Sequence, residues 1–178
     1  MDLGSLQKQL NELSDQLPPV DKWNPDFCGD MDIKIKHDGS WFYMGTPIGR
    51  KSLVKLFSSV LKREDDDYFL VTPVEKIGIQ VVDSPFVITQ WHIQDKRLVF
   101  TTQTDENILV SADNPVILQA DLTTGDILPY ILVRRNLWAR LHQNVFYQLA
   151  ELGQQRQFEG DNHLLVNSAD YAFSLGKL

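Results

Sequence analysis

The chain has 178 residues, and its composition, 43% hydrophobic and 23% charged, is typical of a globular protein rather than a disordered one. A formal net charge of −7 argues against a nucleic-acid binder, because affinity for DNA or RNA comes largely from clustered lysines and arginines. No apolar run approaches the length of about twenty residues that crosses a membrane, and the N-terminus lacks a secretory pattern. The single cysteine, Cys28, excludes an internal disulfide, so we expect a cytoplasmic protein.

Positive charge is concentrated between residues 31 and 63, where seven lysines and arginines stand against two aspartates. These cations are Lys34, Lys36, Arg50, Lys51, Lys55, Lys62 and Arg63. Such a local patch suits a small anionic ligand better than a long polyanion, which would meet the acidic remainder of the surface. A solvated helix face with a charged turn would give the same composition, and both interpretations stay open.

Residues 3–17 predict an amphipathic helix, because leucines recur at helical spacing with polar residues between them. The leucines are Leu3, Leu6, Leu10, Leu13 and Leu17. Pro18 and Pro19 end the segment. The helix precedes the pattern of strands that follows, so it either docks on the body, pairs with a second copy or receives a protein partner.

The next part of the chain predicts a helix packed on a sheet. Alternation over 31–36 and 41–44, on either side of Asp38-Gly39, indicates a hairpin. An apolar stripe over 53–61 predicts a helix, and residues 68–72 and 76–82 predict a second pair of strands.

The second half predicts an antiparallel meander, curled or closed so that few strand edges stay open. Its strands are expected at 86–94, 97–103, 108–111, 115–120 and 127–134. Asn136 is then expected to cap a long helix that carries Trp138, Leu141, Val145, Leu149 and Leu152 along one side. Two short strands at 163–167 and 171–175 close the chain.

Each half therefore consists of strands, a helix and a hairpin, and Phe69–Thr72 resembles Leu164–Asn167 behind the respective helices. We interpret this echo as an internal duplication, with a groove between the related halves as a natural ligand site. The predicted fold class is α+β. It comprises an N-terminal helix and linker over 1–20, a helix-on-antiparallel-sheet domain over 21–84, and a barrel-like antiparallel sheet capped by a helix over 85–178.

The segment between Asp38 and Ser52 is the clearest candidate ligand site, because an aromatic strand leads into a glycine-bracketed loop and a helix. Gly49 permits close approach of a ligand to the backbone, and Arg50 offers a planar fork for phosphate or carboxylate at the helix N-terminus. A structural turn with Arg50 in an ion pair would have the same sequence. The glycine spacing and Pro47 do not fit the phosphate loop of nucleoside triphosphatases.

Further candidates flank this segment. Trp41 and Tyr43 share one face of the aromatic strand, either in the core or stacked on a planar ring. Glu75 and Lys76 follow a proline turn and either contact a ligand or form a salt bridge. The expected C-terminal helix begins beside arginines that oppose its dipole, namely Arg134, Arg135 and Arg140. A bound anion would offset that repulsion, as would acidic partners elsewhere.

The sequence contains no pattern typical of a metal site or a catalytic apparatus. Its histidines are scattered without ligand spacing: His37, His92, His142 and His163. Cys28 is a nucleophile only if a base accompanies it. We therefore expect no metal, no cofactor and no catalytic residue.

Five strings resemble a bacterial family known as domain of unknown function 1285. They are W-N-P-x-x-C-G at 23–29, D-G-S-W-F-Y-x-G-T-P-I-G-R at 38–50, L-V-T-P-V-E-K at 70–76, G-I-x-V-x-D-x-P-F at 78–86 and P-Y-x-x-V-R at 129–134. The resemblance implies a two-part body with duplicated cores, a C-terminal part similar to a pleckstrin-homology barrel, a nucleotide-like ligand between the parts and a signalling role. It also implies that Arg50, Lys76 and Arg134 are ligand-binding candidates, although Arg135-Asn136 replaces the glycines of the family pattern.

Together these observations predict a non-catalytic sensor that binds a nucleotide-like or other small anionic ligand in a groove between its halves. The candidate ligand-binding residues are Trp41, Tyr43, Gly49, Arg50, Glu75, Lys76 and Arg134. Two alternatives stay open. One is a small hydrolase or transferase acting on a phosphorylated or acyl molecule, and the other is an adaptor that binds protein through the N-terminal helix.

Overall fold

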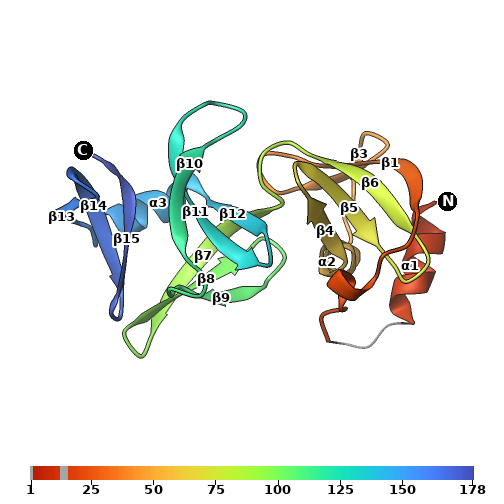
Figure 1. Cartoon of the computed structure of the whole chain (residues 1–178), viewed down its shortest axis with the longest axis horizontal. Helices are drawn as coiled ribbons and strands as arrows, with labels where there is room; N and C mark the ends of the chain where they lie inside the picture. Colours follow the sequence, from red (N-terminus) through yellow and green to blue (C-terminus); the bar gives the residue numbers. More distant parts are fainter. Residues whose placement is uncertain (1, 13–15) are drawn as a thin grey trace. The chain divides into compact units, whose positions relative to one another are not determined.

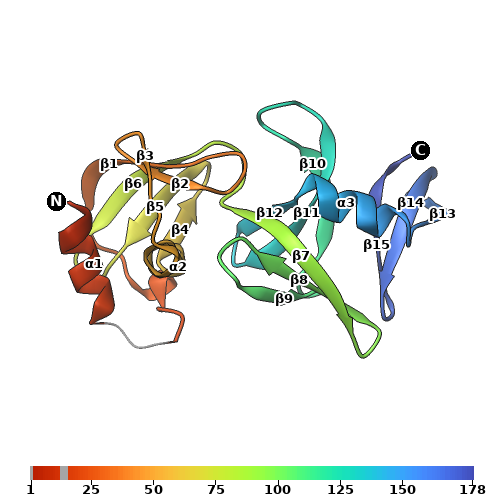
Figure 2. The ribbon, with the colours of Figure 1, turned by 180° about the vertical axis from the view of Figure 1, so that it is seen from behind.

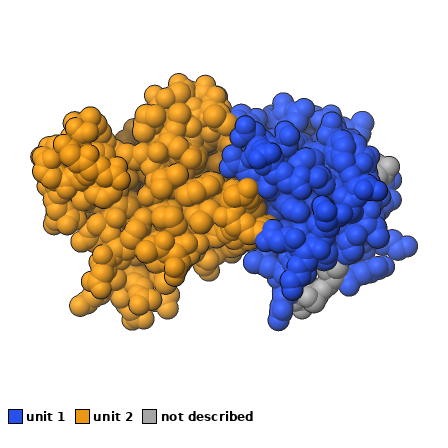
Figure 3. All heavy atoms as spheres, viewed as in Figure 1, with its two compact units in different colours: residues 1–36, 40–82 blue, residues 37–39, 83–178 orange. Residues whose placement is uncertain are grey.

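The computed structural model describes residues 2–12 and 16–178. The chain divides into two compact units, shown in different colours in Figure 3. Unit 1 comprises residues 1–36 and 40–82, and unit 2 comprises residues 37–39 and 83–178. The short turn 37–39 therefore belongs to unit 2 although both its flanking strands belong to unit 1, a division that the sequence did not predict.

Unit 1 begins with helix α1 (Leu3–Asn11), which packs against helix α2 (Lys51–Ser59). Asp2 caps α1, since its side chain accepts a hydrogen bond from the backbone N–H of Ser5. The expected extension of this helix to Leu17 is wrong: Leu17 follows the helix and is 57% exposed, so no core contact holds it in a helical turn. Leu13 lies outside the described residues.

The sheet of unit 1 has six strands in the order β3-β2-β1-β6-β5-β4 (Figure 1, with β2 labelled in Figure 2). They are β1 (Phe27–Ile35), β2 (Trp41–Tyr43), β3 (Thr46–Pro47), β4 (Leu61–Glu64), β5 (Asp67–Val71) and β6 (Lys76–Val81). A short 3-10 helix, η1 (Val20–Lys22), precedes β1. The two hairpins and the helix that the sequence predicted are confirmed, but strand β4 was missed.

Strands β1 and β6 pair in parallel, which makes the sheet mixed rather than antiparallel as expected. Alternation predicts which face a strand buries but not which strand becomes its neighbour. The α2 side chain Phe57 packs against Trp41, and both are almost fully buried. This contact fixes α2 on one face of the sheet.

Unit 2 contains a second six-stranded mixed sheet, in the order β10-β11-β12-β7-β8-β9, which curls into a half-barrel (Figure 2). Its strands are β7 (Phe86–Gln94), β8 (Arg97–Thr102), β9 (Asn107–Leu109), β10 (Val116–Ala120), β11 (Ile127–Arg134) and β12 (Leu137–Leu141). The five strands expected from even spacing are confirmed. The sixth, β12, pairs antiparallel with β11 and parallel with β7.

The long C-terminal helix predicted to start at Asn136 is wrong. Arg135 adopts a positive φ of 51° in the turn between β11 and β12, so the chain reverses into a strand instead of starting a helix. Helix α3 covers only Gln143–Ala150 and is capped by the side chain of His142. Arg134 and Arg140 consequently lie on strands, and the argument from a helix dipole does not apply to them. No helix in the described ranges is both long and apolar enough to cross a membrane.

The remaining strands form a three-stranded antiparallel sheet behind α3: β13 (Gln154–Phe158), β14 (Asp161–Ser168) and β15 (Tyr171–Lys177). Strand β13 was not predicted. Each unit thus ends with a helix followed by three antiparallel strands. The series is α2-β4-β5-β6 in unit 1 and α3-β13-β14-β15 in unit 2. The similar segments lie at the middle strand of each series: Phe69–Thr72 covers the end of β5 and the residue after it, and Leu164–Asn167 lies in β14. This agrees with a repeated two-part architecture.

Candidate functional site

Gly49 and Arg50 lie at the start of α2, and both are exposed. Arg50 occupies the N-cap position, where no side chain caps the helix, and the first turn contains no acidic residue. The side chain of Arg50 makes no hydrogen bond or ion pair with any residue in the described part of the chain. A Cβ added at Gly49 would meet no atom within 4 Å, so the backbone beside Arg50 is open.

Trp41 and Tyr43 share the core-facing side of β2, opposite Ile35 and Ile33 of β1. Trp41 is only 2% exposed, and its ring packs on Phe57. Tyr43 is half-buried. Of the two aromatic candidates, only Tyr43 is therefore accessible to a ligand.

Lys76 and Glu75 are engaged in contacts within unit 1. The Nζ atom of Lys76 lies 2.5 Å from Oε2 of Glu64 and 4.5 Å from the centre of the Phe69 ring. That ion pair holds the pKa of Glu64 below its usual value. Glu75 accepts a hydrogen bond of 2.8 Å from Nε2 of Gln9 in α1.

Arg134, the one candidate in unit 2, is largely buried and forms an ion pair with Glu106. Its guanidinium also lies over the ring of Phe86, at 5.2 Å. Arg50 and Arg134 belong to different units, and the prediction that they share one ligand stays a prediction.

Tyr43 and Glu75 come together in a pocket of about 490 Å³ in unit 1, which is also lined by the exposed Cys28. The thiol of Cys28 donates a hydrogen bond to the carbonyl of Asp26. Among the residues that the structure describes, no histidine, lysine or arginine lines this pocket, so its described lining has no cation to activate the thiol as a nucleophile.

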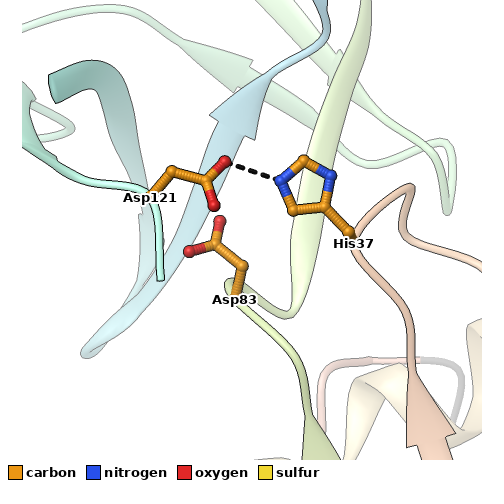
Figure 4. Close-up of side chains that lie close together, drawn as sticks. All are labelled: His37, Asp83 and Asp121. Atoms are coloured by element: carbon orange, nitrogen blue, oxygen red, sulfur yellow. Dashed lines mark hydrogen bonds and ion pairs between the residues drawn. The ribbon is translucent and has the colours of Figure 1, made fainter. Parts of the chain in front are cut away.

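A buried polar cluster in unit 2 joins His37, Asp83, Asp121, Tyr130 and Arg140. Figure 4 shows the first three, with Nε2 of His37 at 2.6 Å from Oδ2 of Asp121. Asp83 accepts hydrogen bonds from the hydroxyl of Tyr130 (2.7 Å) and from the N–H of Leu122 (2.8 Å). The guanidinium of Arg140 lies with Nε at 3.8 Å from both carboxylates.

Burial and hydrogen bonding oppose each other at Asp121, which is 1% exposed. Burial favours the neutral acid, but hydrogen bonds from His37 and from the N–H groups of Thr123 and Thr124 outweigh it. The pKa of Asp121 therefore lies below its ordinary value. Burial, together with the hydrogen bond to Asp83, raises the pKa of Tyr130 well above its usual range, so this hydroxyl stays protonated.

Ligand atoms of His37, Asp83 and Asp121 lie within 4.8 Å of one another, a spacing compatible with a divalent cation. The charges around these three side chains do not favour a divalent cation. Arg140 already provides the positive charge beside both carboxylates, and each of the four carboxylate oxygens accepts a hydrogen bond. A metal ion would face a fixed guanidinium and displace these donors, so we assign the cluster a structural role.

His37 is also poorly placed for proton transfer. Its Nε2 is bound to Asp121, and its Nδ1 lies 3.4 Å from Nη2 of Arg140. Both ring nitrogens therefore have partners within unit 2, although the side chain is 35% exposed. Nη2 of Arg140 donates to the carbonyl of His37 at 2.8 Å, so the same arginine holds the backbone of this turn.

Sequence reasoning missed this cluster because its members are far apart in the chain and follow no motif spacing. His37 and Asp121, for example, are separated by 84 positions. Asp83 stands in the D-x-P-F string at 83–86, but no local spacing connects it to the other members of the cluster.

Two family models together match residues 18–175. "Domain of unknown function (DUF1285), N-terminal domain" matches residues 18–84, and "Protein of unknown function (DUF1285), C-terminal domain" matches residues 85–175. The chain belongs to the DUF1285 family. No curated protein matches the sequence.

Two crystal structures of DUF1285 family proteins are similar to this chain. The protein from Silicibacter pomeroyi DSS-3 is 40% identical, with a TM-score of 0.86, and the match covers 99% of this chain and 96% of that one. The protein from Shewanella baltica OS155 is 31% identical, with a TM-score of 0.57 and coverage of 68% and 91%. Both relatives are bacterial, as the resemblance of the sequence strings implied.

Proposed function

We propose that this DUF1285 protein is a non-catalytic sensor that binds a small anionic, nucleotide-like ligand at the start of α2. The observation that carries the proposal is the exposed guanidinium of Arg50, which has no partner in the described residues, at an uncapped helix N-terminus. A helix start presents unpaired N–H groups and the positive end of the dipole, and both favour an anion.

Two further features support an anion at this position. The first turn of α2 contains no carboxylate that would compete for the N–H groups. Gly49 leaves open space beside the backbone, so a phosphate group can approach without meeting a side chain. Arg50 then supplies a planar pair of donors that matches phosphate or carboxylate oxygens.

We infer a signalling role in the cytoplasm rather than catalysis. The Cys28 pocket has no cation or histidine among the described residues of its lining to activate the thiol, and both ring nitrogens of His37 already have partners, which supports this choice over a hydrolase or transferase. Leu6 and Leu10 of α1 are buried inside unit 1, so the adaptor alternative loses the apolar face that it needs.

Isothermal titration calorimetry with ATP, AMP and pyrophosphate tests the proposal on the wild-type chain and on Arg50→Ala. We expect the variant to lose about tenfold in affinity for at least one of these ligands, because a charge-assisted bidentate contact disappears. Arg97→Ala is the matched control, since Arg97 is also exposed and unpaired within the described chain. Equal affinities for wild type and Arg50→Ala would remove Arg50 from the site.

Turnover of any substrate in a broad screen, lost in Cys28→Ser, would contradict the non-catalytic assignment.

A further inference from the structure

On the side of β6, strand β1 pairs in parallel through residues between Phe27 and Ile35, and the register shifts on either side of Asp30. On the side of β2, its partners cover residues 33–35, and a hydrogen bond of 2.9 Å from the N–H of Met44 to the carbonyl of Asp32 ends the ladder. Residues 27–31 have no strand neighbour on that side within the described chain. Such an edge presents unpaired N–H and C=O groups that can pair with an additional strand.

The pocket of about 490 Å³ lies beside this free edge, because five consecutive residues of β1, 28–32, line it. Its apolar lining comes from Met31, Tyr43, Met44 and Ile77, and Met44 is 68% exposed. A Cβ added at Gly29, which has a positive φ of 101°, would meet no atom within 4 Å, so the space over this residue is open. The edge offers backbone pairing, and the pocket beside it offers space for side chains of the added strand.

The charge of the pocket is uniformly negative. Asp30, Asp32 and Glu75 line it, and no lysine, arginine or histidine is among the described residues of its lining. The hydrogen bond from Gln9 holds Glu75 in place. A cationic side chain is therefore the complement of this surface, whereas the anion proposed for Arg50 is not.

We propose that the free edge of β1 binds an extended segment of a partner protein that carries lysine or arginine. The segment adds as a strand beside residues 27–31, with an apolar side chain against Tyr43 and Met31 and a basic side chain near Asp30 and Asp32. Backbone pairing gives affinity, and the carboxylates select the basic sequence. A second copy of this chain is a poor occupant, because each copy carries a net charge of −7. This surface does not include Gly49 or Arg50, the residues that carry the proposed anion site, although Tyr43 and Glu75 were candidates for that ligand.

A basic β-forming peptide, N-acetylated and C-amidated Lys-Val-Thr-Val-Lys, is the probe. Cys28 is the single cysteine and lines the pocket, so its alkylation by iodoacetamide, followed by mass spectrometry, reports occupancy directly. We expect alkylation to slow about tenfold when the free peptide is at about ten times its Kd, since only the unoccupied fraction reacts. The same peptide with glutamate in place of lysine, and a version N-methylated at alternate amides, should not protect Cys28.

A second experiment changes the charge of residues that line the pocket. Asp32→Lys should weaken binding of the basic peptide about tenfold, measured by fluorescence anisotropy, because attraction becomes repulsion. Met44→Lys places a cation at the same rim from the next turn and should act alike, which covers the case that one variant does not fold. Asp113→Lys, an exposed aspartate of unit 2, should bind like the wild type. Equal protection by the glutamate or N-methylated peptide, or unchanged affinity in both rim variants, overturns the proposal. The proposal is also overturned if the chain self-associates and the peptide dissociates the oligomer, because the occupant of the edge would then be a second copy.

Discussion

Arg140 joins groups of unit 2 that are distant in sequence. Its Nη1 donates to the carbonyl of Leu141 at 3.2 Å, and its Nη2 donates to the carbonyl of His37 at 2.8 Å. Its charge lies between the carboxylates of Asp83 and Asp121, both almost fully buried. A buried charge of this kind is tolerated only with its partners present, so each member of the cluster depends on the others.

Asp121→Asn should therefore destabilise the protein, by about 3 kcal/mol near neutral pH, because it leaves Arg140 with half of its counter-charge. The folded pKa of Asp121 is lowered, so its stabilising contribution is complete above the ordinary value of 3.8 and disappears as pH falls through the lower folded pKa. Urea unfolding from pH 2 to pH 8 measures this. The gap between wild type and variant should be constant above pH 4 and narrow in stronger acid.

The exposed Asp113 provides the control, since Asp113→Asn should leave the unfolding free energy unchanged at every pH. A gap for Asp121→Asn that widens in acid would contradict the assignment of a lowered pKa.

At the level of single elements, the hairpin between β13 and β14 turns through Glu159 and Gly160, both at positive φ (52° and 88°). Two-residue turns of this geometry prefer Asn-Gly, because asparagine tolerates the left-handed region better than glutamate. Glu159→Asn should raise the unfolding free energy by about 0.5 kcal/mol, measured by chemical denaturation.

Glu159→Val is the matched opposite change. A β-branched side chain is strained at positive φ, so this variant should be less stable than the wild type. If Glu159→Val raised the unfolding free energy, or Glu159→Asn lowered it, the positive φ at this position would not determine the stability of the turn.

The fold was predictable from sequence where the signal is local. The stripe of α2 and the alternation of β5 and β6 each depend on a few adjacent residues, and both predictions are confirmed. Residues 137–141, Leu-Trp-Ala-Arg-Leu, have apolar positions that suit either a helix or a strand. The deciding feature was the positive φ of Arg135, which the sequence signals poorly because turns usually use glycine or asparagine there.

Candidate sites were predictable to a smaller degree. The exposure of Arg50 follows from its place before a helix, and Tyr43 does lie beside a pocket. The partners of Lys76 and Arg134, Glu64 and Glu106, belong to other strands, so no spacing along the chain reveals them. The free edge of β1 was equally invisible, because it depends on where a neighbouring strand ends.

For the whole molecule, the net charge of −7 predicts no appreciable binding to nucleic acid. Fluorescence anisotropy with a labelled 20-base-pair DNA and a 20-nucleotide RNA should show no complex at 150 mM salt and micromolar protein. Any weak binding at low salt would come from the cations between residues 31 and 63. This binding should disappear as the salt concentration rises. Saturable binding at 150 mM salt would contradict the prediction.

The parallel pairing at the centre of each large sheet has a consequence for how the protein emerges from the ribosome. Strand β1 ends at Ile35, but its parallel neighbour β6 begins only at Lys76. In the second sheet, β7 starts at Phe86 and cannot complete its pairing until β12, which ends at Leu141, has been synthesised. Pairings between distant segments form late, since the loop between them must close first. During synthesis the nascent chain therefore carries Ile33 and Ile35 without their final cover, and chaperones that recognise apolar strands have their longest opportunity to bind in that interval.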